Sequence, residues 1–221
     1  MSTPSSLTVS ATETLRKIAA APPDPAQLAQ ALRHLAKWRS ELVGNTLLER
    51  SGTAVLTGPF AGMEYPVRAS EGARAARLIG CYEASLAPVI EAIVAGGYEQ
   101  VIDVGCAEGY YAVGLARRMP QARVLARDED ARAQMLCRAL AEANGVADRV
   151  KIGGRLDHAG FDICRDHRSV VICDIEGAEE DLLDPIRAAG LLSADILVEC
   201  HDGMRPGLSE RIAARFADTH A

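Results

Sequence analysis

The chain has 221 residues, of which 48% are hydrophobic and 24% charged, and its formal net charge is −6. This composition is that of a globular protein, and the length favours one α/β domain with an N-terminal addition. An acidic chain without a basic stripe is a poor candidate for nucleic-acid binding, and no stretch suggests a membrane span. The N-terminus lacks signal-peptide features and the six cysteines form no C-x-x-C pair, so we expect a cytoplasmic protein with reduced, buried thiols.

Residues 1–97 are expected to form a helical and extended region before the core. A short helix is predicted over residues 12–21, where two prolines end it. Asp24 followed by Pro25 is a strong start for a second helix, which should continue to about residue 42. The apolar residues of this helix are expected along one face: Leu28, Ala31, Leu32, Leu35, Trp38 and Leu42.

The rest of this region predicts further short elements. Residues 54–56 and 63–67 flank a turn and suggest a small hairpin. Ser70 is expected to cap a helix that breaks near Gly80 and resumes over residues 82–95. We expect residues 1–97 to be a cap, which lies over a ligand site or forms a homodimer contact. A packing extension without contact to substrate is an equal alternative.

Residues 101–104 predict a buried parallel strand that contains Asp103. Gly105 and Gly109 then turn the chain sharply, and residues 110–119 have apolar residues at helical spacing. The two glycines can adopt positive φ and allow a ligand to approach the backbone closely. The free N–H groups at the helix start are expected to face that ligand.

The turn reads D-V-G-C-A-E-G-Y-Y, which fails the dinucleotide fingerprint G-x-G-x-x-G because position 110 is Tyr, and the chain contains no P-loop. It resembles motif I of the class I S-adenosylmethionine (SAM) methyltransferases and departs from it only at Ala107. An ordinary strand–turn–helix is the alternative. The resemblance implies a Rossmann-like, doubly wound, mostly parallel sheet over residues 98–221. The cofactor-binding residues that it implies are Asp103, Gly105, Cys106, Ala107, Glu108, Gly109 and Tyr110.

Residues 123–127 predict the second strand, with Asp128 at its end. A carboxylate there can accept hydrogen bonds from both ribose hydroxyls, so Asp128 is a candidate for binding the sugar of the cofactor. Asp130 is the second candidate, and could instead cap the helix predicted over residues 131–144. A third strand is predicted at residues 150–152.

Residues 169–173 and 194–200 predict a fourth and a fifth strand. In an open parallel sheet, ligands bind at the carboxyl ends of the strands. These two strands and the first should therefore bring polar residues to one rim: Glu108, Asp174, Glu176, Glu199, His201 and Asp202.

The sequences D-I-E-G-A-E and I-L-V-E-C-H-D at these strand ends are similar to those of FkbM-type methyltransferases, and the resemblance covers roughly residues 99–203. It implies SAM-dependent O-methylation of a sugar or natural-product hydroxyl. Two features depart from the family: the second strand ends in R-D-E-D rather than Phe-Glu-Pro, and no final antiparallel strand pair follows the helix that begins at Ser209. We expect either a truncated chain or an N-terminal region that replaces those strands.

Methyl transfer to a hydroxyl suggests roles for the polar residues at the strand ends. SAM carries an activated methyl group, but a hydroxyl acceptor must also lose its proton to a base or near a metal. His201 is the best candidate for the base, with Asp174 and Glu199 beside it, and Asp174 could also bind the SAM amino group. A His201 that only bonds Glu199 is an equal alternative. Asp174, Glu176, Glu199 and His201 could together hold Mg²⁺ or Mn²⁺.

The sequence therefore predicts a SAM-dependent methyltransferase that acts on the hydroxyl of a small molecule. A non-catalytic SAM-binding module is one alternative. A nicotinamide-dependent oxidoreductase is a weaker one, because the third glycine of its fingerprint is missing.

Overall fold

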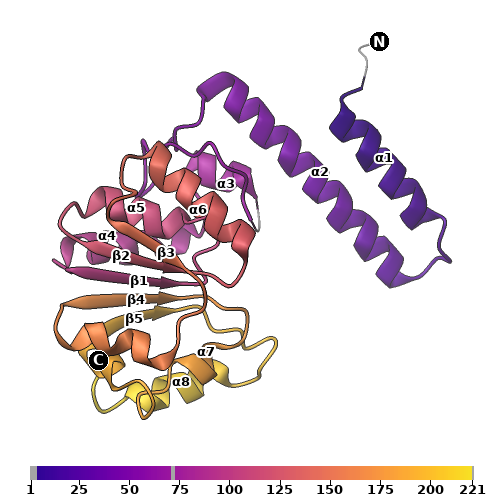
Figure 1. Ribbon diagram of the computed structural model, residues 1–221. Helices are drawn as coiled ribbons and strands as arrows, with labels where there is room; N and C mark the ends of the chain where they lie inside the picture. The colour runs from indigo at the N-terminus through magenta and orange to yellow at the C-terminus, as the bar shows by residue number, and fades with distance from the viewer. Residues whose placement is uncertain (1–3, 71–72, 221) are drawn as a thin grey trace.

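The structure is a computed structural model that describes residues 4–70 and 73–220. Five parallel strands form one sheet in the order β3-β2-β1-β4-β5 (Figure 1). β1 (Gln100–Val104) is central, with β2 (Arg123–Arg127) and β3 (Val150–Gly153) on one side, and β4 (Ser169–Cys173) and β5 (Ala194–Val198) on the other. The strand order reverses between β1 and β4, as in Rossmann-like doubly wound sheets. The predicted fold class is therefore confirmed.

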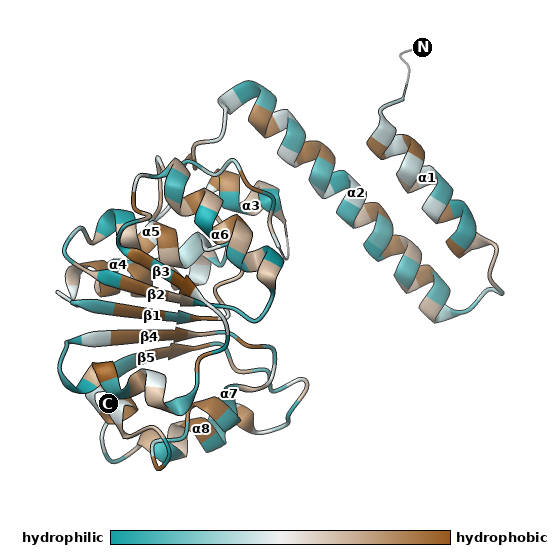
Figure 2. Cartoon of the chain, viewed as in Figure 1, coloured by the Kyte–Doolittle hydropathy of each residue, from teal (hydrophilic) through white to brown (hydrophobic). Residues whose placement is uncertain are grey.

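Helices cover both faces of the sheet (Figure 1). On one face lie α4 (Ala87–Ala95), α5 (Tyr110–Arg118) and α6 (Ala131–Ala143). On the other lie α7 (Glu179–Leu182), α8 (Leu208–Phe216) and the 3₁₀ segments η2 (His158–Arg165) and η3 (Ala189–Ser193). Consecutive strand residues enter opposite cores, because side chains alternate along a strand. Val101 belongs to the first apolar cluster and Ile102 to the second, which explains why consecutive residues in the middle of the strands are mostly hydrophobic (Figure 2).

Two long helices precede this body and extend away from it as a hairpin (Figure 1). α1 (Ser6–Ala19) begins earlier than expected, because Ser5 caps it by accepting a hydrogen bond from the Thr8 amide. α2 (Pro25–Ser51) begins where Asp24 predicted, since the Asp24 side chain accepts from the Gln27 amide at 2.8 Å. It runs well past residue 42, and its C-terminal part packs on α3 (Arg74–Ile79).

The segment between α2 and α4 differs from the prediction in two respects. Ala73 stands at the N-cap of α3 without a side-chain hydrogen bond, so Ser70 does not cap that helix; residues 71–72 lie outside the described part. The expected hairpin is reduced to a single antiparallel bridge between Ala54 and Glu64. The predicted break at Gly80 is confirmed: its φ is +88°, and a Cβ there would overlap the carbonyl of Thr57.

Residues 74–95 satisfy the length and hydropathy of a membrane span, with a mean hydropathy of 1.6, which corrects the expectation that no stretch would. In the structure this segment is not one helix: it consists of α3, a turn at Gly80, the short η1 (Ala84–Leu86) and α4. Leu78 and Ile90 belong to the apolar core beside α5. Only 17% of its most apolar window is buried, so packing inside the body accounts for only part of this hydropathy.

The cap and the sheet share one apolar core. Phe60, Met63 and Tyr65 of the cap lie in the same buried cluster as Val101 and Val113. The domain boundary near residue 97 stays a prediction. In the described part of the chain every strand of the sheet is parallel, and a final antiparallel pair is not among them.

The six cysteines are free thiols. Four are buried, Cys200 is half-buried and Cys81 is exposed, so the expectation of buried thiols holds for four of them. Burial and a hydrogen bond with Cys137 raise the pKa of Cys106, the hydrogen bond being the larger cause.

Candidate active site

A cavity of about 960 Å³ opens at the carboxyl ends of the central strands. The turn after β1 forms its floor, the segment from α3 to η1 forms one wall, and the ends of β4 and β5 form the opposite wall. This is the position at which doubly wound sheets bind ligands. The predicted site residues that line it are Asp103, Gly105, Cys106, Ala107, Glu108, Tyr110, Asp128, Asp174, Glu176 and Glu199. Gly109 and His201 are not among the lining residues.

The turn after β1 has the backbone that its glycines predicted. Gly105 has φ +82°, and a Cβ there would overlap the carbonyl oxygen of Asp174 at the end of β4. Gly109 has φ +89°, and a Cβ there would meet the Cys137 thiol. Ala107, which replaces the middle glycine of motif I, also has positive φ, at +49°. The alanine therefore adopts the backbone region that glycine usually supplies, at some cost in strain.

Several amides of this turn already have protein partners, whereas the expectation of free N–H groups concerned the start of α5 at Tyr110. Gly105 and Cys106 both donate to the Arg127 carbonyl, at 2.8 and 3.0 Å. The Ala107 amide donates to Asp128 Oδ2 at 2.9 Å. These bonds fix the turn after β1 to the end of β2, so the floor of the cavity is rigid before any ligand binds.

Asp103 is 3% exposed and lies inside β1. Its Oδ2 atom is buried and has no hydrogen-bond partner among the described residues. Burial chiefly, with the nearby carboxylates of Asp174, Asp128 and Glu108, raises the pKa of Asp103 to about 7, although a hydrogen bond from the Ala112 amide lowers it. A buried carboxylate oxygen without a donor is costly, so this atom fits a ligand that supplies a donor or a positive charge.

Asp128 and Asp130 divide the two roles that the sequence left open. Asp128 lines the cavity, and each of its oxygens accepts one backbone amide, from Ala107 and from Asp130 at 2.8 Å. Asp130 is the N-cap of α6 and accepts from the Arg132 amide at 2.8 Å. The hydrogen bonds hold the Asp128 carboxylate in place, and each oxygen keeps lone-pair capacity for a ligand hydroxyl.

Glu108 connects the turn to the cap. Its side chain is fully buried, and it forms an ion pair with Arg77 Nε at 2.6 Å. It also accepts from the Tyr65 hydroxyl at 2.7 Å and from the Ser70 amide at 2.8 Å. Three segments of the cap therefore converge on one carboxylate. Glu108 lines the cavity, but its contacts make it a link between cap and core.

The cap wall of the cavity is aromatic and acidic. Arg77 lies over the Tyr82 ring at 3.8 Å from its centroid, which orients this ring. Tyr111 of α5 donates to Glu83 at 2.5 Å, and Glu83 itself has positive φ, at +46°. The part of the expected cap that reaches the cavity is thus residues 77–86, while α1 and α2 extend away from it (Figure 1).

The opposite wall carries the carboxylates of the fourth and fifth strands. Asp174, Glu176 and Glu199 line the cavity. His201 lies behind them: its Nε2 is 3.7 Å from Asp174 Oδ1 and 3.4 Å from Glu176 Oε2. Its Nδ1 donates to Glu179 Oε1 at 2.8 Å, so the partner of His201 is Glu179 rather than the Glu199 expected from the sequence.

The protonation of this wall follows from its geometry. Burial raises the pKa of Asp174 to about 6, and Glu199 contributes next. Burial lowers the pKa of His201, but the hydrogen bond to Glu179 and the surrounding carboxylates outweigh it and leave the pKa raised. Glu179 accepts from the amides of Ile175 and Gly177. Burial raises the pKa of Glu179, yet these bonds outweigh it, so the net direction is downward.

The ligand geometry for a cation also differs from the prediction. In the described part of the chain, the atoms that lie within 4.8 Å of one another belong to Asp174, Glu179 and His201, not to the predicted set with Glu176 and Glu199. Because His201 Nδ1 and Glu179 Oε1 already bond each other, that nitrogen carries a proton and cannot bind a metal. Of the two ring nitrogens of His201, Nε2 is the one near Asp174 and Glu176, which line the cavity.

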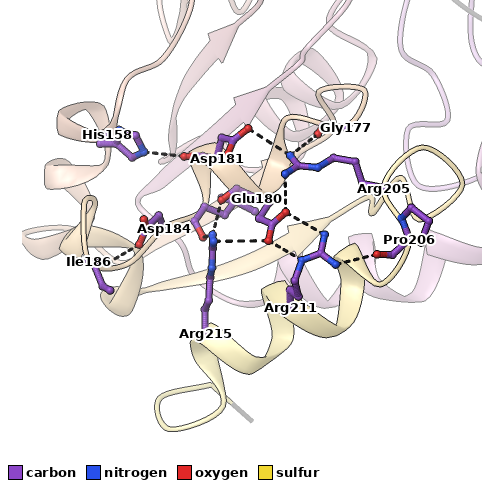
Figure 3. Close-up of polar contacts among 11 residues, drawn as sticks. His158, Gly177, Glu180, Asp181, Asp184, Ile186, Arg205, Pro206, Arg211 and Arg215 are labelled. Atoms are coloured by element: carbon purple, nitrogen blue, oxygen red, sulfur yellow. Dashed lines mark hydrogen bonds and ion pairs between the residues drawn. The ribbon is translucent and has the colours of Figure 1, made fainter.

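Ion pairs anchor the turn after β4 from below (Figure 3). Glu180 bonds Arg205 and Arg211, both at 2.7 Å, and its backbone carbonyl accepts from Arg215. Arg205 also donates to the Gly177 carbonyl at 3.0 Å. The turn that presents Asp174 and Glu176 is therefore tied to α8 and to the loop before it.

Sequence reasoning missed several contributors to the site. Arg77, Tyr82 and Glu83 come from the cap and carry no motif that could have predicted them. Glu179 stands in D-I-E-G-A-E, and its position in that motif was the available signal for its contact with His201. The acidic positions at the strand ends were readable because parallel strands end at one edge of a sheet.

The chain is similar to known methyltransferases in sequence over part of its length. The model of the methyltransferase small domain family matches residues 86–162, from the end of the cap to η2. This match contains β1, the turn with Asp103 and Gly105, and Asp128. No curated protein matches the chain.

Solved structures resemble it at low identity. An O-methyltransferase from Bacillus cereus in complex with SAH aligns at 15% identity and a TM-score of 0.43, over 59% of this chain and 65% of its own. A putative O-methyltransferase from Klebsiella pneumoniae aligns at 14% and 0.47, over 95% and 83%. The SAH-bound Podospora anserina methyltransferase PaMTH1 aligns at 15% and 0.47, over 86% and 76%. These are likenesses of fold, and the chain spans about two thirds of the Bacillus protein.

Proposed function

We propose that this protein is a SAM-dependent methyltransferase that acts on the hydroxyl of a small molecule. The observation that carries the proposal is the buried, unpartnered carboxylate oxygen of Asp103 at the end of the central strand, beside a cavity whose floor is the turn from Gly105 to Gly109. The family model supports it, because the matched residues 86–162 contain that turn. The finer FkbM-type resemblance, with its sugar or natural-product acceptors, stays a prediction.

The residues present fit the cofactor. SAM offers an ammonium group and two ribose hydroxyls as donors. Asp103 Oδ2 and Asp174 Oδ1 are buried acceptors without a described donor, and the two oxygens of Asp128 keep free lone pairs. We infer that Asp128 binds the ribose hydroxyls and that Asp103 and Asp174 face the positively charged part of the molecule. When bound, SAM supplies a methyl group that its sulfonium has already activated.

The opposite wall would remove the proton of the acceptor hydroxyl. Asp174 lines the cavity and its raised pKa of about 6 makes it a better proton acceptor than an ordinary carboxylate. Asp174 would accept the proton of the acceptor hydroxyl, and SAM would supply the methyl group to its oxygen and leave as S-adenosylhomocysteine. His201, held by Glu179, stabilises the charge of Asp174 from behind. Asp174 thus takes over the role that the sequence assigned first to His201.

The cap would exclude water from the reacting atoms. Tyr82 and Leu86 of the cap line the cavity together with Tyr111 of α5, and the two phenols stay protonated at neutral pH, so they do not compete with the acceptor hydroxyl as nucleophiles. Many of the lining residues are acidic, which supports a small, uncharged or cationic acceptor and opposes a nucleic acid.

Titration calorimetry with SAM and with S-adenosylhomocysteine tests the proposal. We expect saturable binding that Asp128→Asn weakens by about tenfold, since each hydrogen bond to a charged group contributes roughly 1.5–3 kcal/mol. Asp130→Asn makes the same chemical change two residues away and should leave binding unchanged, because Asn also caps helices well. Absence of SAM binding would remove the proposal, and saturable NADH binding would favour an oxidoreductase instead.

Turnover separates an enzyme from a binding module. We expect methyl transfer to a panel of small hydroxyl compounds to be lost in Asp174→Asn at saturating SAM, where weaker binding of SAM to this variant no longer limits turnover. A divalent cation at this wall is a further prediction, and it requires that EDTA abolish turnover. Binding without transfer to any acceptor would support the non-catalytic module.

A further inference from the structure

We propose that the hairpin of α1 and α2 joins two copies of this chain, with the N-terminal half of α2 packed antiparallel against α2 of the second copy. α2 has 27 residues, and Gly44 is its buried residue. α1 covers one side of the helix, where Trp38 donates to Thr8 at 3.4 Å and His34 contacts the Ala11 carbonyl at 2.8 Å. Another side of the N-terminal half meets solvent (Figure 2).

The solvent-facing side carries an apolar stripe. Leu28, Leu32 and Leu35 are 69%, 70% and 40% exposed. Their spacing of four and three residues places them in one row along the helix. The single apolar face predicted from the sequence is therefore divided: Trp38 turns towards α1, and the three leucines remain without a partner in the described part of the chain.

The stripe ends in opposite charges. Four residues before Leu28 lies Asp24, and four residues after Leu35 lies Arg39, so both stand on the same row as the leucines. Both are exposed, and Arg39 forms no ion pair with a described residue. Along the helix the row reads acid, three leucines, base.

Two copies of this row have complementary charges when the helices run antiparallel. In an antiparallel pair related by a two-fold axis near Leu32, Leu28 meets Leu35 of the second copy, and Asp24 meets Arg39 of the second copy at both ends. A parallel pair would instead place like charges together. Self-complementary surfaces of this kind are those of two-fold symmetric dimers, which points to a second copy of this chain as the occupant.

The contact is modest in size. The row from Asp24 to Arg39 is about 24 Å long at a rise of 1.5 Å per residue. With the adjoining edge of α1 it approaches roughly 1,000 Å² of total buried surface, the lower end of specific interfaces. We therefore expect a reversible dimer whose population depends on protein concentration.

Sedimentation velocity of the full chain tests this from about 1 µM to about 100 µM, where a weak dimer should form. We expect the weight-average sedimentation coefficient to rise with concentration, and Leu32→Glu to hold it at the monomer value. Lys37→Glu is the matched control, because Lys37 is exposed on the side of α2 opposite the leucines and should leave the dimer intact. Circular dichroism confirms that each variant keeps its helices.

The charges test the register. Arg39→Glu should raise the dissociation constant by about tenfold, because it sets two acids against each other at both ends. A chain that stays monomeric throughout, or a dimer that Leu32→Glu and Arg39→Glu leave unchanged, would overturn the proposal. If the leucine stripe binds a different protein instead, the purified chain should keep the sedimentation coefficient of a monomer at every concentration.

Discussion

The two walls of the cavity are built in different ways. The floor and the side near β2 come from one local unit, in which the turn after β1 bonds to the end of β2 through Arg127 and Asp128. The wall at β4 depends on a contact between distant segments, that of Glu179 with His201, and the cap wall depends on another, that of Tyr111 with Glu83. A local unit can be recognised from a short motif, whereas a wall assembled from separate segments depends on the whole fold.

The sharpest way to break the local unit is Gly105→Ala. The added Cβ would overlap the Asp174 carbonyl, so β1 and β4 would have to separate at their ends. We expect a loss of more than about 3 kcal/mol in the free energy of unfolding, measured by urea denaturation. Gly97→Ala is the matched control: its φ is also positive, at +69°, but no atom lies within 4 Å of the new Cβ, so it should lose only about 1 kcal/mol. Equal losses would mean that backbone strain, rather than the close approach, fixes Gly105.

The link between cap and floor is tested by Glu108→Gln. The change removes the charge of the carboxylate that lies 2.6 Å from the buried Arg77 guanidinium, and the loss of a hydrogen bond to a charged group typically costs about 1.5–3 kcal/mol. Glu91→Gln removes an ion pair with Arg118 at the surface and should change stability little. If both variants unfold at the same denaturant concentration, the buried ion pair does not hold the cap.

Asp103→Asn should stabilise the ligand-free protein, in contrast to the two changes above. Because the folded pKa of about 7 lies above the unfolded value of 3.8, the wild type loses stability as pH rises through this window. The melting temperature of the variant should therefore exceed that of the wild type by a margin that grows from pH 4 to pH 8, reaching roughly 5 °C or more. SAM binding should weaken in the same variant. A difference in melting temperature that does not change with pH would contradict the raised pKa of Asp103.

Glu179→Gln tests the wall at the end of β4. We expect the pKa of His201 to fall, because the variant loses the hydrogen-bonded carboxylate that outweighs burial. A raised folded pKa stabilises the protein at low pH and loses that effect as pH rises, so the variant should be destabilised more at pH 5 than at pH 9. NMR titration of the imidazole measures the shift directly. Glu176→Gln, at an exposed carboxylate 3.4 Å away, should lower the same pKa less.

These differences explain what the sequence could and could not predict. The five strands, the helices at residues 110 and 131, and the caps at Asp24 and Asp130 were readable because periodicity and capping are local. The sequence offered Glu199 as one alternative partner of His201, but the backbone direction after β5 brings the imidazole to Glu179 of α7. The contacts of Glu108 with Tyr65 and Arg77 join positions more than thirty residues apart, and no local pattern encodes them.

The accessibility of the thiols has a practical consequence for studying this site. Cys81 is the exposed thiol, and it adjoins Tyr82, which lines the cavity. Burial raises the pKa of Cys164, Cys173 and Cys200, so these thiols form little of the reactive thiolate. A maleimide fluorophore should therefore couple first to Cys81 in the unmodified chain. The dye would sit beside the aromatic wall and signal its rearrangement in real time, without any engineered cysteine.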